Sequence, residues 1–135
     1  MGRYIGKQTV KKIIATGMNT NRARVLVMWI TCKEDVTDIR NSKVVDIISE
    51  LAEFGISVDI IDPAADAHHV NEEYKLELKD QPSGKYDAII LAVSHKQYIK
   101  LDENWFGSFL NKEGIIVDVK GVLRGKILNH TYWSL

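Results

Sequence analysis

The chain has 135 residues, enough for one domain with a substantial core, and its 18 basic and 18 acidic side chains balance. This balance argues against a broad nucleic-acid footprint, which needs a basic excess. No apolar run approaches the roughly 18–20 residues that span a bilayer, and the first residues lack an apolar signal-peptide core. A single cysteine, Cys32, excludes an internal disulfide framework and is typical of a reducing compartment. We therefore expect a cytoplasmic protein.

The first half of the chain alternates a helix, a strand and a helix. Residues 3–16 follow helical spacing, and Gly17 is placed to end that helix. Residues 24–30, RVLVMWI, are almost all apolar, which predicts a strand buried on both faces. Residues 42–54 form a second helical pattern, and Gly55 follows as its stop. The apolar positions of the two helices are Val10, Ile13, Ile14 and Met18, then Val44, Ile47, Ile48, Leu51 and Phe54.

The second half continues the alternation. Strands are predicted over residues 56–61, 86–93 and 115–119, with short helices over 64–74 and 101–110. The tail from Gly121 onward is only weakly patterned. Continuously apolar strands that alternate with helices indicate a parallel sheet covered on both faces. We expect an α/β domain of three layers with a mostly parallel sheet, preceded by an N-terminal helix.

Ligands of such sheets bind beyond the carboxyl ends of the strands. The first of these loops, residues 31–41, exceeds the usual length of about two to six residues, and long loops there often carry function. Within it, Lys33 could act as a point charge on phosphate, and Arg40 could make bidentate contacts. The alternative interpretation is a solvated charged loop with internal ion pairs.

Two further loops carry candidate residues. Lys120, in DVKG, ends the fourth strand and could reach an anionic ligand beside Lys33, or it is an exposed lysine before a turn glycine. His95 could contact a ligand or transfer a proton, or it satisfies local backbone groups. His68 and His69 lack the i,i+4 spacing of a metal pair, so we predict no metal. Without a G-x-S-x-G, P-loop or G-x-G-x-x-G motif, we predict no catalytic residue and no self-contained dinucleotide site.

The chain resembles the C-terminal domain of the UDP-glucose/GDP-mannose dehydrogenase family over RVLVMWITCKEDVTDIRNSKVVDIISELAEFGISVDIIDPAAD. It is similar to the branch that oxidises UDP-N-acetylhexosamines over YDAIILAVSHKQY and IIVDVKGVL. The most specific part is a K-x-x-x-x-D-x-R-x-S motif together with DVKG. The resemblance implies that residues 1–20 are the end of the connecting helix of a central dimerisation domain. It implies that residues 21–135 are a Rossmann-like UDP-sugar-binding domain.

The resemblance also implies ligands and partners. Enzymes of this family join an N-terminal NAD-binding domain, a central helical domain beside the catalytic cysteine and lysine, and the UDP-sugar-binding domain. Lys33 falls where a loop lysine contacts the UDP-sugar, and Lys120 falls where a basic residue approaches the sugar of a neighbouring subunit. Arg40 falls where an arginine reaches toward NAD, which is bound mainly by the N-terminal domain absent from this chain. The expected partners are therefore a UDP-sugar, that NAD-binding domain and further copies in a homo-oligomer, without nucleic acid or membrane.

Two functions follow from these observations. The first is the UDP-sugar-binding part of an NAD-dependent 6-dehydrogenase that oxidises a UDP-N-acetylhexosamine to its uronic acid for surface polysaccharide biosynthesis. The isolated chain is then expected to be inactive, since the family's catalytic cysteine motif does not occur in it. The second is a stand-alone, non-catalytic nucleotide-binding or assembly module with weakened ligand binding. Trp29 and Cys32 stand where the family usually has Gly and Phe, departures expected to weaken nucleotide binding. Trp29 and the missing NAD-binding half favour the second function, while the intact set of Lys33, Arg40 and Lys120 favours the first.

Overall fold

The computed structural model of the chain describes residues 2–28, 43–61, 78–79, 81–92, 102–119, 121 and 123–134. These residues form a six-stranded sheet in the order β3-β2-β1-β4-β5-β6, and each neighbouring pair is parallel. The strands are β1 (Arg24–Met28), β2 (Ser57–Ile61), β3 (Leu78–Lys79), β4 (Tyr86–Leu91), β5 (Leu110–Asp118) and β6 (Thr131–Ser134). From β1 the chain moves outward to β3, returns to the centre as β4, and moves outward the other way to β6. The predicted α/β class with a parallel sheet is confirmed.

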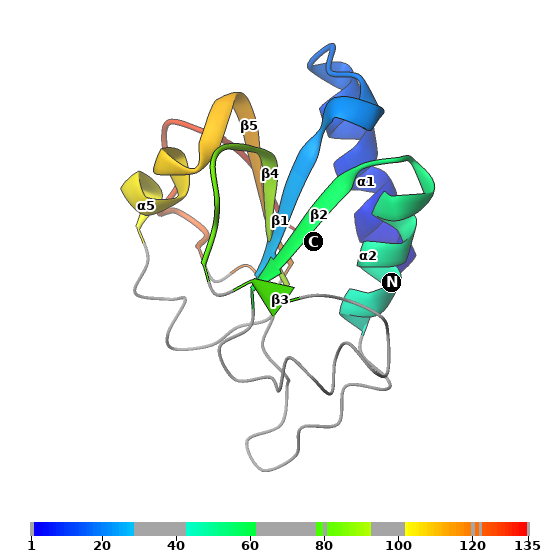
Figure 1. Ribbon diagram of the computed structural model, residues 1–135. Coiled ribbons are helices and arrows are strands. Elements are labelled where there is room, and N and C mark those ends of the chain that lie inside the picture. Colours follow the sequence, from blue (N-terminus) through cyan, green and yellow to red (C-terminus); the bar gives the residue numbers. More distant parts are fainter. Residues whose placement is uncertain are drawn as a thin grey trace.

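Helices lie on both faces of the sheet and complete three layers (Figure 1). The helices are α1 (Gly2–Ala15), the short 3-10 helix η1 (Thr20–Arg22), α2 (Lys43–Glu53) and α5 (Glu103–Ser108). Figure 1 shows α1 and α2 side by side on one face, with α5 on the other side of the sheet. The predicted N-terminal helix is therefore confirmed as a helix packed on the sheet.

Two glycines end the long helices as the sequence predicts. Gly17 has φ +87° and Gly55 has φ +78°, in the left-handed region that residues with a Cβ avoid. After α2, the Gly55 amide donates to the Ala52 carbonyl at 3.0 Å, and the Ile56 amide donates to the Leu51 carbonyl at 3.3 Å. These bonds satisfy helix-end carbonyls and turn the chain into β2.

The contact between α1 and α2 depends on a glycine and a buried acid. A Cβ added to Gly6 would lie 2.7 Å from the Cβ of Glu50, so only glycine allows this approach. Glu50 is 2% exposed, and its Oε2 accepts a hydrogen bond from the Arg3 guanidinium at 2.7 Å. The buried carboxylate is thus paired, as a charge away from water requires.

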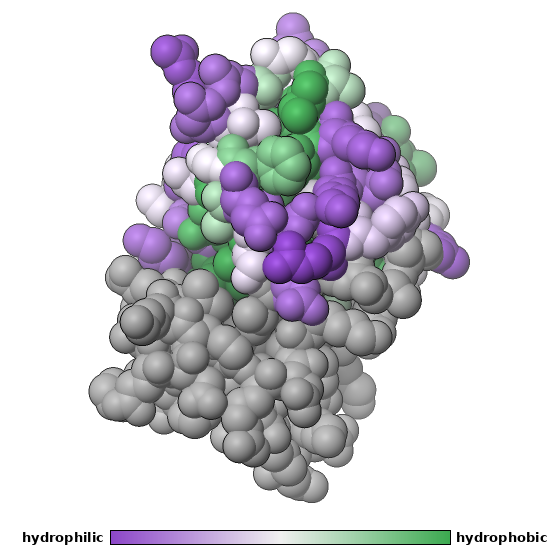
Figure 2. Space-filling view, turned by 90° about the vertical axis from the view of Figure 1, so that its right-hand side faces the viewer, coloured by the Kyte–Doolittle hydropathy of each residue, from purple (hydrophilic) through white to green (hydrophobic). Residues whose placement is uncertain are grey.

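Apolar side chains from both helical layers and the central strands form one core. Every residue of β4 is buried, and four of the five residues of β1 are buried. Two expected core positions differ: Ile14 is 53% exposed and Phe54 is 42% exposed. The buried face of α1 includes Ile5 and Ile13, which are eight residues apart and lie on the same side of the helix. Ile14 points about 100° away from Ile13 around the helix axis, and therefore lies outside that buried face. Figure 2 faces the side of α1 and α2 and shows hydrophobic residues reaching the surface among hydrophilic ones.

The second half of the sheet departs from the sequence pattern. The tail contains β6, and β5 begins at Leu110, five residues before the predicted start. Exposed side chains at Asn111 and Lys112 hide the start of β5 from an apolar pattern, and β6 is a partly exposed edge strand with little apolar signal. Trp133, in β6, packs against the core. The helix predicted over 64–74 lies outside the described residues.

Candidate functional site

The carboxyl ends of five strands form a row at one edge of the sheet. Met28 pairs in register with Ile61 on one side and with Leu91 on the other. Leu91 pairs with Asp118, and Asp118 pairs with Ser134. The direction of winding reverses between β1 and β4, so the switch point of the sheet lies inside this row (Figure 1). In open α/β sheets this is the edge where ligands bind.

The predicted site residues follow these strand ends along the chain. Lys33 and Arg40 come after β1, and Lys120 comes two residues after the end of β5. All three lie outside the described residues, as do His95, Trp29 and Cys32. Their proposed contacts with UDP-sugar and NAD therefore stay predictions; the strands that precede them in the sequence end at one edge of the sheet.

The described part of this edge is dominated by Asp118. Its side chain is fully buried at 0% exposure. One carboxylate oxygen, Oδ2, accepts hydrogen bonds from the Leu123 amide and from the Tyr132 hydroxyl, both at 2.6 Å. A buried carboxylate is costly unless such donors replace water. Asp118 therefore closes the turn that follows β5 and links it to β6.

The same turn depends on a glycine. Gly121 has φ +72°, and a Cβ added there would lie 2.8 Å from Nε of Arg124. The Arg124 guanidinium donates from Nε and from a terminal nitrogen to Oγ of Ser134, at 3.3 and 3.1 Å. The turn glycine expected in DVKG is therefore required by its backbone conformation, and the Arg124 side chain lies in the space that a Cβ would enter.

Tyr132 is held as a hydrogen-bond donor. Burial, then the hydrogen bond to Asp118 and the negative charge of that carboxylate, raises the pKa of Tyr132 to about 12. The phenol consequently keeps its proton at neutral pH and is suited to holding Asp118, not to accepting protons. Sequence patterning missed this pair because Tyr132 stands in the weakly patterned tail, 14 residues from Asp118.

A second set of contacts ties the segment before β6 to α5. The carboxylate of Glu103 accepts from the amides of Leu128 and Asn129 at 2.9 and 2.7 Å, and lies 2.7 Å from Nδ1 of His130. The Leu128 amide and then the His130 side chain hold the pKa of Glu103 down, at about 2. The His130 ring fills space beside Gly107, where a Cβ would lie 2.9 Å from Cε1 of the ring. These contacts hold residues 128–130, which lead directly into β6, against α5.

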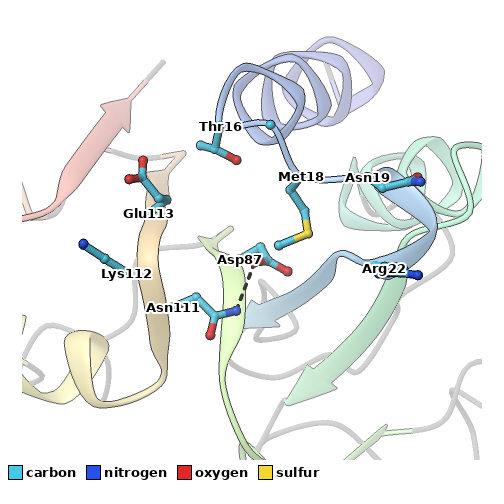
Figure 3. Close-up of a pocket in the computed structure, with 9 residues that line it drawn as sticks. Thr16, Met18, Asn19, Arg22, Asp87, Asn111, Lys112 and Glu113 are labelled. Carbon is cyan, nitrogen blue, oxygen red and sulfur yellow. Dashed lines mark hydrogen bonds between the residues drawn. The ribbon is translucent and has the colours of Figure 1, made fainter.

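A pocket at the opposite, amino end of the strands differs in character (Figure 3). It has a volume of about 540 Å³ and is lined by Thr16, Gly17, Met18, Asn19, Arg22, Asp87, Asn111, Lys112 and Glu113. Figure 3 shows Asn111 directed toward Asp87, and its amide donates to Oδ1 of that residue at 3.0 Å. The other oxygen of Asp87 accepts from the Arg24 amide at 2.9 Å. Asp87 thus fastens β1, β4 and β5 together, and the pocket lies away from the edge that the topology assigns to ligands.

The described residues contain neither a metal-binding cluster nor a membrane-spanning helix. Within those residues, no group of three or more His, Cys, Asp or Glu side chains is placed to hold a metal ion. Among the helices of that same part, none combines the length and the apolar character needed to cross a membrane.

The chain is similar in sequence to one protein family and to several known enzymes. Residues 26–125 match the model of the UDP-binding domain of the UDP-glucose/GDP-mannose dehydrogenase family. The chain is 40% identical over 124 residues to a UDP-N-acetyl-D-glucosamine 6-dehydrogenase from Pseudomonas aeruginosa, covering 91% of this chain and 29% of the relative. It is 36% identical to the enzyme of that name from Salmonella typhi, with the same coverage. The chain thus spans less than a third of the length of these relatives.

A solved structure shares the fold. The UDP-D-ManNAc dehydrogenase from Pyrococcus horikoshii aligns with a TM-score of 0.79 at 15% identity, covering 99% of this chain and 30% of that one. The N-terminal helix and the tail strand are therefore included in the structural match, which extends beyond the residues that the family model covers. This agreement supports the predicted Rossmann-like architecture.

Proposed function

We propose, since the chain belongs to the UDP-glucose/GDP-mannose dehydrogenase family and matches its UDP-binding domain, that it binds the UDP portion of a nucleotide sugar at the carboxyl edge of its sheet. The observation that carries this proposal is the extent of the family match. Residues 26–125 include the ends of β1, β2, β4 and β5 and the turn closed by Asp118. The matched segment is therefore the part of the chain that builds the ligand-binding edge.

The residues proposed to contact the ligand are Lys33 and Lys120. Each follows a strand that ends at this edge, and lysine side chains supply point charges for a diphosphate. Arg40 would reach toward NAD held by a separate N-terminal domain, whose own residues carry most of the cofactor contacts. The closed turn after β5 gives Lys120 a fixed backbone on either side, at Val119 and Gly121.

In a complete enzyme the reaction would be the oxidation of a UDP-N-acetylhexosamine to its uronic acid, serving surface polysaccharide biosynthesis. Two relatives named UDP-N-acetyl-D-glucosamine 6-dehydrogenase support this substrate class. This chain would supply binding energy and closure over the substrate, and the family's catalytic cysteine motif does not occur in its sequence. A cytoplasmic location and a homo-oligomeric enzyme belong to the same proposal.

The first helix would be the end of the helix that connects to a central dimerisation domain, within residues 1–20. Its inner face supports a structural role in this unit as well, because Ile5, Val10 and Ile13 are buried in the common core. The N-terminal helix is thus proposed to belong to two units at once, joining them rigidly.

A stand-alone binding module is the second candidate. It is favoured by Trp29, which replaces the Gly usual in the family and follows β1 directly, and by Cys32, which replaces the usual Phe further along the sequence. The two candidates differ in their expected affinity for the nucleotide. The stand-alone module would bind it more weakly, because a larger side chain beside the site would crowd the nucleotide.

The test is a titration of the isotope-labelled chain with UDP, followed by amide NMR shifts. We expect saturable shifts at Met28, Leu91, Val119 and Gly121, with a dissociation constant on the order of 1 mM, or about −4 kcal/mol. Uridine without phosphates, as the control ligand, should produce smaller shifts because the lysines have no charge to meet. Shifts confined to the amino-end pocket, around Asn19, would contradict the assigned edge, and the absence of shifts would contradict UDP binding.

A further inference from the structure

The turn after β5 is held from outside by the tail strand. Tyr132 and Ser134 alternate along β6 and therefore project on the same face. Tyr132 donates to Asp118 at the start of the turn, and Ser134 accepts from Arg124 at its end. Two residues of one short strand thus secure both ends of a turn that contains Lys120.

The start of the turn is also fixed from the sheet. The Val119 amide donates to the Leu91 carbonyl at 3.0 Å, and the Leu123 amide donates to Asp118 at 2.6 Å. Three donors thus hold this part of the turn: the Val119 amide bonds to β4, and the Leu123 amide and the Tyr132 hydroxyl bond to Asp118. Of these donors, only the Tyr132 hydroxyl lies beyond residue 125, where the family match ends.

We propose that Tyr132 is a positioning residue for the nucleotide site: its hydroxyl, acting through Asp118, holds the turn whose described residues Val119 and Gly121 flank Lys120 in the sequence. The inference rests on the proposed function, because it takes UDP as the ligand of this edge. The inference adds a residue of the tail to the site, although no residue of the tail is proposed to contact UDP itself.

The physical reason is the burial of Asp118. When the Tyr132 hydroxyl is removed, a fully buried carboxylate loses a short hydrogen bond, and Oδ2 must recruit water or shift to replace it. The turn then samples more conformations, and the ligand has to order it on binding. We expect the Tyr132→Phe variant to bind UDP about two- to tenfold more weakly, the range of one net hydrogen bond.

The fold provides a matched control. The Tyr86 hydroxyl donates to Oδ2 of Asp59 at 2.6 Å, the same distance as in the Tyr132–Asp118 pair. Tyr86 begins β4, at the amino end of the sheet, away from the proposed site. Both Tyr→Phe variants should lower the melting temperature, and only Tyr132→Phe should weaken UDP binding. Affinities are measured by the NMR titration, well below the melting temperature of each variant.

A double-mutant cycle with Lys120→Ala distinguishes positioning from general loosening. If Tyr132 acts through the turn that carries Lys120, Tyr132→Phe should weaken UDP binding much less in the Lys120→Ala background than in the wild type. As a second measurement, the Leu123 amide should exchange with solvent faster in Tyr132→Phe than in Tyr86→Phe, since its acceptor is Asp118.

The outcomes separate the two proposals. Failure of the wild-type chain to bind UDP overturns the proposed function and this inference together. Clear wild-type binding with unchanged affinity in Tyr132→Phe overturns the positioning role alone. The same conclusion follows if Tyr86→Phe weakens binding equally, or if the loss persists undiminished beside Lys120→Ala.

Discussion

Replacing Gly121 by alanine tests the account of the turn after β5. The left-handed φ of +72° costs an alanine roughly 1–2 kcal/mol relative to glycine. The added Cβ would also lie 2.8 Å from Nε of Arg124, so the guanidinium must move and its contacts with Ser134 are strained or lost. One net hydrogen bond contributes about 0.5–1.5 kcal/mol. The sum is a loss of about 1.5–3.5 kcal/mol in the free energy of unfolding.

The chain contains a control for the conformational part of this cost. Gly125 has φ +77°, and a Cβ there meets nothing within 4 Å. Gly125→Ala should therefore cost only the conformational term, about 1–2 kcal/mol. The additional loss of unfolding free energy in Gly121→Ala, relative to Gly125→Ala, measures the cost of displacing Arg124.

The assay is thermal and urea unfolding of both variants, followed by circular dichroism. For a chain of 135 residues, an unfolding entropy of about 2.1 cal/mol/K per residue gives a shift of about 3–4 °C per kcal/mol. Gly121→Ala should melt several degrees below wild type and below Gly125→Ala. Equal melting temperatures for the two variants would refute the assigned cost of displacing the Arg124 guanidinium.

Three further predictions concern ligand binding, acid stability and activity. Lys33→Ala should weaken UDP binding about ten- to a hundredfold with little change in melting temperature, and Lys33→Glu should weaken it more. Equal affinities of the wild type and Lys33→Ala for UDP, measured by calorimetry, would reject Lys33 as a ligand residue. Because the pKa of Glu103 is lowered in the folded state to about 2 from 4.5, its stabilising contribution is present above about pH 4.5 and is lost as the pH falls toward 2. Glu103→Gln should therefore flatten the dependence of unfolding free energy on pH in that window, and an unchanged slope in acid titrations would count against the assigned contacts. The isolated chain should form no NADH from a UDP-N-acetylhexosamine, and NADH formation proportional to chain concentration would show the opposite.

Local chemistry by itself determined the central elements and their ends. Residues of β1 and β4 form continuous apolar runs, and such runs are stable only where both faces of a strand are covered. Gly17 and Gly55 mark helix ends because they adopt a conformation that other residues avoid. The alternation of these elements indicated the parallel sheet, and the motif residues indicated the family.

Tertiary structure alone decided which distant segments meet. β6 is a partly exposed edge strand that pairs through its backbone with β5, and its four side chains show no apolar alternation that would mark a strand. The bond between Asp118 and Tyr132 joins residues 14 apart, and the contact of Glu103 with His130 joins residues 27 apart. No periodicity encodes such pairs, because the value of each hydrogen bond depends on burial that exists only after the sheet has assembled. The sequence thus points to the lysine of DVKG, while the fold supplies the buried carboxylate and the tail strand that hold its turn in place.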